Sequence, residues 1–591
     1  MLKIETMQNF YPYDTEEDIK NKKVILDHIG VNEQGINNFL NPSLKIFNHP
    51  FDMKDLEKAL DRLISAFEKK EKILFYGDYD ADGVTTTALF IKSLRDKGIK
   101  VDYYVPHRHK DGYGLNANRM EEFAQKYDLI VTGDTGIKEM ETVHNCPIDV
   151  IITDHHEPFV TSDKNLLKQY KEKSTFIEKN GETMVIPSAY AVVNPKRIDC
   201  NYPNKCLSGV AVIFKLLQGL FIKKSWDQMD IIKHLDMVAV GLVADLVPQF
   251  DIENQDSEVR LMTLAGIQMM NQDPKPWVQT IIELANIKKV DFSSLGFVFG
   301  PRFNAAGRLD SAFPVVEFLL EDNFDLSFEK GQLLEKFNKE RKELQKLATE
   351  NIQEFLSNRD SSWYDRIVVV KADPEYHSGI AGLVASQLVS TYNVPSIVLC
   401  EKTIDGEVYL TGSCRSIEGI DILHLLIETE KTLGNYKYGG HEMAAGLTIK
   451  LDQFELFREA IRKAAFKLDD SKFAKDNLFY EIELPINELS LSIVQFIENT
   501  NSKIRLFSPN NYIYSPPTQL GKSIINASVY IEKERSRYRA SLWKRGEEFR
   551  ELYAKDLFEY IDIVYTTGMF NDNISISIDN YSIPNKKYTK D

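Results

Sequence analysis

Residues 73–83 of the chain, ILFYGDYDADG, decide its fold class. The apolar run at the start of this stretch leads into acidic residues, and an amphipathic stretch follows at 84–97. Short apolar runs between helical stretches are typical of buried parallel strands. Two more such runs occur at 129–131 and 150–152. We therefore predict an α/β fold with an open parallel sheet between residues 46 and 330.

Acidic or imidazole side chains follow four apolar runs along the chain. The segments are DYDADG at 78–83, GD at 133–134, DHH at 154–156 and AD at 244–245. The carboxyl ends of parallel strands lie along one edge of a sheet, so we expect the four segments to converge in space. One such Asp alone would be typical of a turn or a helix cap, but four at predicted strand ends favour a common site.

The convergence of these residues predicts a centre for divalent metal ions. Several carboxylates packed together raise one another's pKa unless cations neutralise them. Asp combined with one or two His is the ligand set of Mn²⁺, Mg²⁺ or Zn²⁺ sites. Two ions about 3.5–4 Å apart can activate a hydroxide and stabilise a leaving oxygen, which is the chemistry of phosphoester hydrolysis.

The rest of the chain divides into further predicted regions. Residues 326–356 lack Pro and carry apolar residues at helical spacing among Lys and Glu, which predicts a long connecting helix. A smaller α/β unit begins with the apolar strand at 367–370. Short alternating runs rich in Tyr, Ile and Ser near the C-terminus predict a β-barrel. The predicted regions are an N-terminal extension (1–45), a catalytic α/β domain (46–325), the connecting helix (326–356), a second α/β domain (357–466) and a β domain (467–591).

Composition narrows the class of protein further. The 591 residues carry a formal net charge of −16, which argues against a protein that coats nucleic acid by bulk charge. Five scattered Cys favour a reducing compartment, and Cys200 with Cys206 lacks the second pair that a zinc site needs. The sequence shows no targeting signal and no run long enough to span a membrane, so we expect a cytoplasmic protein.

The acidic segments belong to a larger set of motifs that resembles a known family. DYDADG at 78–83, GDTG at 133–136, DHH at 154–156 and VADLVP at 243–248 resemble the four motifs of the DHH phosphoesterase superfamily. Further matches are HRHKDGYGLN at 107–116, GPRFNAAGRLD at 300–310, HSGIAGLVAS at 377–386, GSCRS at 412–416 and GGHEMAAG at 439–446. The last three resemble the DHHA1 domain that accompanies the catalytic domain. As a set, the motifs are similar to those of the single-stranded-DNA exonucleases of this superfamily.

The resemblance implies roles for residues of the acidic segments. The implied metal ligands, for two Mn²⁺ or Mg²⁺ ions, are Asp80, Asp82, Asp134, His155 and Asp245. Within this set Asp134 would bridge the ions, and Asp80 and Asp134 would take part in catalysis. His156 would contact the scissile phosphate or its attacking water. Asp78 and Asp154 would not bind the ions themselves but would orient the residues that do.

The resemblance also implies contacts with DNA. Arg108, Ser413 and Arg415 would hold the 5′ phosphate of the strand, and an Arg guanidinium suits this role because it offers a planar fork of donors. The residues that would contact the scissile phosphate or the nearby backbone are Arg302, Asn304, Arg308 and His441. Cys414 stands beside this pocket, and we interpret it as a packing residue and not as a nucleophile.

The C-terminal region departs most from the family pattern, but its β character suggests an OB-like barrel. Alternate residues of a strand share one face, so Arg535, Arg537 and Arg539 would lie together. With Tyr538 and Trp543 nearby, these residues could form a basic and aromatic surface that tracks a single strand. An ordinary exposed hairpin is the alternative interpretation.

The function implied by the resemblance is a metal-dependent 5′→3′ exonuclease that hydrolyses single-stranded DNA to 5′ mononucleotides in DNA repair and recombination. Its partners would be single-stranded DNA, a single-strand-binding protein and a helicase, with no membrane. One alternative is a DHH phosphodiesterase that acts on short oligoribonucleotides or cyclic dinucleotides. Another is a non-catalytic replication scaffold, whose signature would be the loss of the metal carboxylates.

Overall fold

The computed structural model describes residues 14–583 except for short gaps. The gaps are residues 109, 163–166, 169, 180, 361–362, 374–375, 377, 405, 435, 470–472, 474–479, 501–503, 521–522, 544, 556–557, 559 and 571–572. The described residues form two compact units. Residues 31–341 make up the first unit, and residues 14–30 with 342–583 make up the second.

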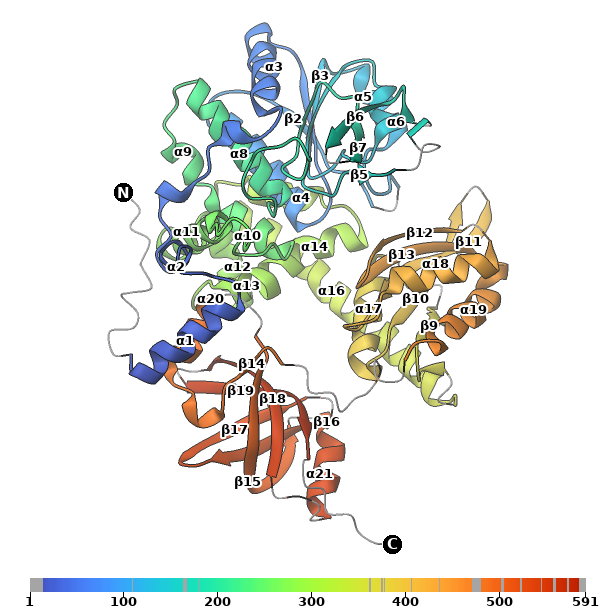
Figure 1. The fold of residues 1–591 in the computed structure, drawn as a ribbon. Coiled ribbons are helices and arrows are strands. Elements are labelled where there is room, and N and C mark those ends of the chain that lie inside the picture. The colour runs from blue at the N-terminus through green and yellow to red at the C-terminus, as the bar shows by residue number, and fades with distance from the viewer. Residues whose placement is uncertain are drawn as a thin grey trace. The chain divides into compact units, whose positions relative to one another are not determined.

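A parallel sheet of five strands organises the first unit (Figure 1). Its strands lie in the order β2-β1-β3-β4-β8, and every neighbouring pair is parallel. The strands are β1 (Ile73–Tyr76), β2 (Asp102–Tyr104), β3 (Leu129–Gly133), β4 (Asp149–Thr153) and β8 (Ala191–Val193). The open parallel sheet predicted from the apolar runs is thus confirmed.

Alternate residues of the sheet face two separate apolar cores. Phe75 and Val131 belong to one core, whereas Leu74 and Ile130 belong to the other. The helices that contribute to the first core include α3 (Leu56–Lys69), α4 (Ala81–Arg95), α8 (Gly209–Lys223) and α10 (Leu235–Ala244). The second core includes α5 (Ala117–Ala124), α6 (Met140–His144) and residues of the small sheet of β5 (Phe159–Val160), β7 (Glu182–Pro187) and β6 (Ser174–Lys179).

The apolar run before Asp245 forms helix α10, so our prediction of a strand there was wrong. Every residue from Leu235 to Leu242 is buried, because α10 contacts α4, α8 and α11 (Glu258–Gln272). A helix that is buried on all sides has no polar face. Its sequence therefore lacks the periodicity that distinguishes an amphipathic helix from a buried strand.

Further helices complete the first unit. They are α2 (Ile36–Leu40), η2 (Leu44–Ile46), η3 (Pro50–Asp52), α9 (Met229–Ile232), α12 (Pro276–Ala285), α13 (Phe292–Ser294), η4 (Leu295–Phe299), α14 (Gly300–Leu309) and α15 (Phe313–Leu319). Helix α16 (Phe324–Ser357) begins in the first unit and ends in the second, which confirms the predicted long helix.

The second unit contains a smaller α/β domain, as predicted. Its five strands lie in the order β12-β13-β11-β10-β9, with β9 and β10 parallel and the other pairs antiparallel. The strands are β9 (Val368–Lys371), β10 (Ser396–Ile404), β11 (Glu407–Arg415), β12 (Lys437–His441) and β13 (Ala444–Lys450). The helices are α17 (Ser378–Tyr392), α18 (Ile422–Leu433), η6 (Leu451–Gln453) and α19 (Phe454–Phe466).

The C-terminal part of the second unit is a closed β-barrel, which confirms the predicted architecture. Five strands pair in the order β15-β16-β17-β19-β18, and β18 pairs back with β15. The strands, including β14 at the side of β15, are β14 (Ile482–Glu483), β15 (Leu506–Leu520), β16 (Ser523–Lys533), β17 (Ser536–Leu542), β18 (Tyr560–Phe570) and β19 (Asn573–Ser582). The helices are α1 (Glu16–His28), η8 (Ile486–Glu488), α20 (Leu491–Thr500) and α21 (Gly546–Ala554).

The N-terminal helix α1 belongs to this second unit, although residues 31–45 belong to the first. Lys22 on α1 is buried, and its Nζ donates to Ser492 on α20 at 2.7 Å. None of the helices in the described part of the chain has the length and apolar composition that crossing a membrane requires.

Candidate metal centre

The carboxyl ends of four parallel strands bring polar side chains to one edge of the sheet. Asp78 follows β1, Asp134 follows β3, Asp154 follows β4 and Asn194 follows β8. Asp134 has a left-handed backbone (φ 65°), and its N–H donates to the Thr153 carbonyl at 3.0 Å. This hydrogen bond continues the pairing of β3 with β4 and fixes where the Asp134 carboxylate lies.

Asp80 and Asp82 occupy the loop and first turn between β1 and α4. Asp80 caps α4 by accepting a hydrogen bond from the Gly83 N–H at 3.0 Å. The buried Asp82 carboxylate accepts from the N–H groups of Gly209 (2.6 Å) and Val210 (3.2 Å), at the N-terminus of α8. The positive end of the α8 dipole therefore stabilises a carboxylate that comes from another helix.

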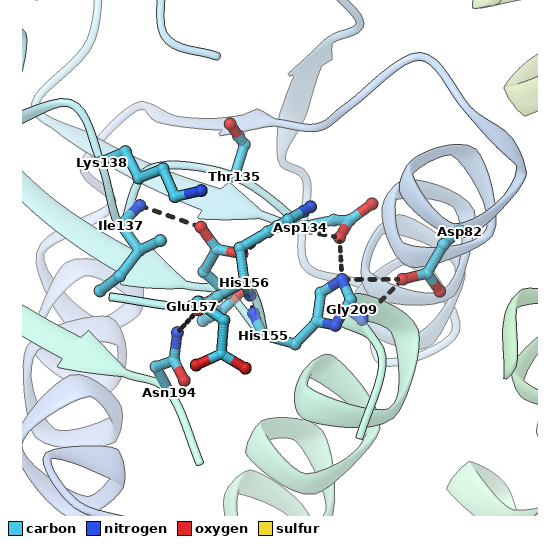
Figure 2. A network of polar contacts seen from close by, with 12 residues as sticks. Asp82, Asp134, Thr135, Ile137, Lys138, His155, His156, Glu157, Asn194 and Gly209 are labelled. Carbon is cyan, nitrogen blue, oxygen red and sulfur yellow. Dashed lines mark hydrogen bonds and ion pairs between the residues drawn. The ribbon is translucent and has the colours of Figure 1, made fainter. Parts of the chain in front are cut away.

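His155 lies between Asp82 and Asp134 (Figure 2). Its Nε2 is 3.0 Å from Asp134 Oδ1, 3.9 Å from Asp82 Oδ2 and 3.8 Å from Asp245 Oδ2. Burial lowers the pKa of His155 to about 3, so the ring is neutral. Because the ring also hydrogen-bonds with the Leu207 backbone, Nε2 presents a lone pair and not a proton to the carboxylates.

The donor set of this site fits a cation. Oδ1 of Asp78 and Oδ1 of Asp134 are buried and have no hydrogen-bond donor as a partner, and the second faces the lone pair of His155. Burial and repulsion among the carboxylates raise the pKa of Asp78, Asp82 and Asp134 well above the usual range, and that of Asp245 to about 7. A divalent ion would bind the unpaired oxygen atoms and reduce the repulsion between the carboxylates.

Three groups of residues in the described chain could each hold a metal ion, with ligand atoms within 4.8 Å of one another. The groups are Asp134 with His155 and His156, Asp82 with His155 and Asp245, and Asp78 with Asp80 and Asp134. Asp134 and His155 each occur in two groups, so the geometry allows one ligand to be shared between two ions. The five residues named as metal ligands from the sequence all occur in these groups.

Asp154 orients His156 and keeps it protonated. Oδ1 of Asp154 accepts from His156 Nδ1 at 2.8 Å, and Oδ2 accepts from the Ile137 N–H at 2.9 Å. Although burial opposes both charges, their pairing lowers the pKa of Asp154 to about 2 and raises that of His156 to about 9. The Nε2 atom of His156 therefore carries a proton and lies 3.0 Å from the Tyr113 hydroxyl.

Two of the DNA contacts implied for helix α14 are engaged within the first unit. Arg302 is buried, and its guanidinium donates to Glu335 through Nε (2.8 Å) and Nη2 (2.7 Å) and to the Val298 carbonyl (2.8 Å). The side-chain oxygen of Asn304 accepts from the Ala81 N–H at 2.9 Å. The Arg302 contacts attach α14 to α16, and the Asn304 contact attaches it to the first turn of α4, so Asn304 also positions the acidic loop.

Two other Arg residues lie near Tyr79 in the same loop. The Arg108 guanidinium lies 5.5 Å from the centre of the Tyr79 ring, and the charge of Arg308 also acts on this phenol. Gly307 lets α14 approach the loop, since a Cβ there would lie 2.7 Å from the Tyr79 carbonyl oxygen. Arg108 and Arg308 thus lie beside the acidic segment that carries Asp78 and Asp80.

The residues implied for the second unit lie on two strands of its α/β domain. Ser413 and Arg415 are on β11, close to the start of α17, where a Cβ on Gly382 would lie 2.8 Å from Arg415 Nη2 and 3.4 Å from Ser413 Oγ. His441 ends β12 and is exposed. Cys414 is fully buried, which raises the pKa of its thiol to about 12 and agrees with a packing role.

The basic residues of the barrel are only partly on one strand. Arg537 and Arg539 are exposed on alternate positions of β17, whereas Arg535 lies in the turn before this strand. Tyr538 points to the other face and is half-buried, and Trp543 follows the strand and is exposed.

The structure also reveals contributors that were not selected from the sequence. Asn194 donates to the His156 carbonyl oxygen at 3.0 Å, and Tyr113 contacts the same residue's ring. Gly209 and Gly241 allow helices to approach the carboxylates, since added Cβ atoms would lie 2.5 Å from Asp134 Cβ and 2.6 Å from Asp82 Oδ1. Their importance depends on contacts between segments far apart in the chain, for which a single sequence carries no signal.

Comparison with known families and proteins agrees with this geometry. The "DHH family, N-terminal domain" matches residues 72–242, and the "DHHA1 domain" matches residues 365–466. The single-stranded-DNA-specific exonuclease RecJ of Bacillus subtilis is 32% identical over 500 residues, which cover 83% of this chain and 57% of that protein. RecJ of Escherichia coli is 31% identical over 477 residues, 77% of each chain.

Solved structures share the fold. The structure of Thermus thermophilus RecJ in complex with Mn²⁺ superposes with a TM-score of 0.69 and 21% identity, covering 96% of this chain and 78% of that one. The same protein in complex with Mg²⁺ gives a TM-score of 0.65 and 19% identity, over 97% of this chain and 77% of that one. With both domain models matched and more than three quarters of the chain aligned to the E. coli protein at 31% identity, the chain belongs to the RecJ family of DHH proteins.

Proposed function

We propose that this protein is a metal-dependent 5′→3′ exonuclease that hydrolyses single-stranded DNA to 5′ mononucleotides. The observation that carries the proposal is the convergence of buried, unneutralised carboxylates on a neutral His155 beside a protonated His156. Such a site can hold divalent cations and contact a phosphate at the same time. The proposed substrate comes from the relatives, which are named as single-stranded-DNA-specific exonucleases. The proposed polarity rests on the 5′-phosphate contacts implied for Arg108, Ser413 and Arg415.

The proposed metal ions are Mn²⁺ or Mg²⁺. Their ligands would be Asp80, Asp82, Asp134, His155 and Asp245, with Asp134 shared. When bound, such a pair supplies a hydroxide nucleophile and charge stabilisation for the leaving oxygen.

The chain's own residues prepare the site for this chemistry. The α8 N-terminus holds Asp82 in place, and the Asp80 cap fixes the first turn of α4. Asp154 holds His156 with its Nε2–H facing outward, where it can donate to a non-bridging oxygen of the scissile phosphate. A charged donor that is already oriented requires no reorganisation when negative charge develops on that phosphate.

We assign the DNA contacts as follows. The 5′ phosphate is bound by Arg108, Ser413 and Arg415. The backbone near the cut is contacted or positioned by His441, Arg302, Asn304 and Arg308.

The proposed domains are a catalytic domain at residues 46–325, a DHHA1 domain at 357–466 and a β domain at 467–591. We also propose that the barrel is OB-like, since it closes with five strands. OB-folds bind oligonucleotides on the face of two neighbouring strands and on adjoining loops. Arg537 and Arg539 lie on such a strand.

The cellular setting follows from the same assignment. An exonuclease of this specificity acts in DNA repair and recombination in the cytoplasm. Its proposed partners are a single-strand-binding protein, which covers the substrate, and a helicase, which produces it. Co-purification of either protein with the full chain, dependent on the barrel surface, would support the assignment.

The central test is the substitution Asp80→Asn. Asn caps helices about as well as Asp, so the α4 N-terminus stays capped while a metal-ligating charge is lost. We expect at least a roughly hundredfold fall in the release of nucleotides from a 5′-labelled single strand with Mn²⁺. Asp61→Asn is the matched control, because Asp61 is an exposed carboxylate on α3 paired only with Lys223.

Two results would count against the proposal. One is an Asp80→Asn protein with an unchanged melting temperature and full activity. The other is a wild-type protein that does not degrade single-stranded DNA, whether labelled at its 5′ or its 3′ end, but cleaves short oligoribonucleotides or cyclic dinucleotides. Turnover of none of these substrates at millimolar Mn²⁺ would favour the scaffold alternative.

A further inference from the structure

Tyr113 stands at the tip of a tight turn beside the metal centre. The two residues that flank it, Gly112 (φ 86°) and Gly114 (φ 81°), both have left-handed backbones. This conformation is strained for most other residues and turns the chain sharply on each side of the tyrosine. The Tyr76 hydroxyl fastens the turn, since it contacts the Gly114 carbonyl oxygen and the Asn116 N–H, each at 3.3 Å.

Asp111 and Glu139 brace the same turn from two sides. The Asp111 carboxylate accepts from the Tyr104 hydroxyl (2.7 Å), the His107 N–H (2.8 Å) and Arg119 Nε (3.0 Å). The Glu139 carboxylate lies so close to Gly114 that a Cβ there would be 2.2 Å from its Oε1. The backbone position of the tip is therefore fixed before any substrate arrives.

The Tyr113 side chain itself is exposed, in contrast to the turn that holds it. It is 58% exposed, and its hydroxyl lies 3.0 Å from His156 Nε2, with the two rings nearly perpendicular at 80°. Asp154 already orients the His156 ring, so the phenol is not needed for that purpose. The hydroxyl instead occupies the place where a phosphate oxygen would meet the Nε2 proton.

We propose that Tyr113 is a nucleobase-binding residue, whose ring stacks on the base of a nucleotide flanking the scissile phosphate. The inference rests on the proposed function and adds a subsite to it. In the free protein the hydroxyl fills the phosphate position on His156. The incoming phosphate displaces it, and the exposed ring then lies next to the base attached to that phosphate. Every base has an aromatic face, so such a platform tolerates any sequence.

Two substitutions separate the ring from the hydroxyl. Tyr113→Phe keeps the ring and should leave the KM for a single strand within about threefold of wild type. Tyr113→Ala removes the stacking surface and should raise KM by about 5- to 150-fold, with a smaller effect on kcat. The matched control is Tyr127→Ala, because Tyr127 precedes β3 and so lies at the opposite, amino edge of the sheet. It should leave KM unchanged.

DNA substrates that lack one base, at the first or the second position from the 5′ end, test directly which base Tyr113 contacts. If Tyr113 stacks on one of these bases, the wild-type protein loses affinity for one abasic strand, and Tyr113→Ala causes no further loss on that strand. An equal effect of Tyr113→Ala on intact and on both abasic strands would overturn the inference. So would equal kcat losses in Tyr113→Phe and Tyr113→Ala, since they would assign the role to the hydroxyl. Failure of the wild-type protein to digest DNA would instead refute the proposed function.

Discussion

His155 and His156 are neighbours in the chain, but the fold gives them opposite protonation states. Burial lowers the pKa of His155 to about 3, whereas the Asp154 carboxylate raises that of His156 to about 9 despite its burial. One ring can offer a lone pair to a metal ion, and the other can offer a proton to a phosphate. The DHH motif thus supplies two different chemical groups from two copies of the same residue.

A third histidine, His234, should make the stability of the first unit depend on pH. It is buried, its Nδ1 lies 3.0 Å from Lys275 Nζ, and its Nε2 lies 3.4 Å from Asp96 Oδ2. Burial, and then the charge of Lys275, lowers its pKa to about 4 from an ordinary value of 6.5. The stabilisation is complete above about pH 6.5 and is lost as the pH falls toward 4, because only the unfolded chain binds the proton readily. Between pH 7 and pH 5 the loss should be about 2 kcal/mol.

Urea unfolding at pH 7 and pH 5 measures this loss. His234→Gln removes the titrating group and should flatten the pH dependence by about the same amount, whereas His144→Gln, at an exposed position on α6, should not. An identical pH dependence in the His234→Gln protein would show that other groups control acid stability.

At the level of elements, the sequence predicts the strands of the site better than its helices. The run before Asp78 is short and apolar and ends at a turn, which identifies β1 without further information. The run before Asp245 looks alike but forms α10, because complete burial removes the periodicity of the helix. Asp245 nevertheless lies with Asp82 and His155, since α10 packs against α4.

The contacts that no pattern predicts are those between segments far apart in the chain. Gly209 begins α8 and touches Asp134, which follows β3, yet nothing in the local sequence connects the two. Tyr113 is similar, because its significance comes from a hydrogen bond to His156 across two loops. Sequence motifs therefore predict the metal ligands, whereas the residues that hold these ligands in place can be identified only from the fold.

Helix α8 supplies a test of this close approach. In Gly209→Ala the new Cβ would lie 2.5 Å from Asp134 Cβ and 2.6 Å from its Oδ1, so the helix or the carboxylate must move. We expect a loss of about 1–3 kcal/mol in unfolding free energy and at least about tenfold weaker Mn²⁺ binding by titration calorimetry.

The matched control lies on the same helix. In Gly219→Ala the added atom meets the side-chain tips of Leu56 (2.9 Å) and Leu60 (3.0 Å), which can move aside, and lies at an ordinary contact distance of 3.8 Å from Phe51 Cε1. Because Ala is also the better helix former, this protein should fold and bind Mn²⁺ like the wild type. Equal Mn²⁺ affinity in the two Ala variants would mean that the α8 N-terminus does not position the ligands.

For the whole molecule, a net charge of −16 disfavours the binding of DNA by bulk charge. Part of the acidity lies in the buried cluster around Asp82 and Asp134, where divalent cations would neutralise it. Other acidic residues are paired within helices, as Glu350 is with Lys346 on α16 at 3.8 Å. Local arrangement, and not the total charge, therefore decides whether a strand can bind.

The barrel surface tests this argument directly. Arg537 and Arg539 share one face of β17, where Arg537 pairs with Glu532 at 2.6 Å and also lies 5.3 Å from the Tyr514 ring centre. If both Arg residues contact phosphates, Arg537→Ala/Arg539→Ala should weaken binding of a long single strand. It should also reduce the slope of log K against log salt by about 1.4.

The control for this double variant removes the same charge from a different surface. Lys339→Ala/Lys346→Ala deletes two cations from the exposed face of α16, where both side chains are at least 70% exposed. Fluorescence anisotropy across a salt series should give this control the wild-type slope if neither Lys contacts a phosphate, because charges more than about 10 Å from the strand are largely screened at 0.1 M salt. If both double variants change the slope equally, DNA responds to the total charge of the protein and the barrel has no dedicated surface. If only the Arg variant changes the salt slope, this acidic protein binds DNA through two or more local cations. The size of the change in slope then gives the number of phosphate contacts that were lost.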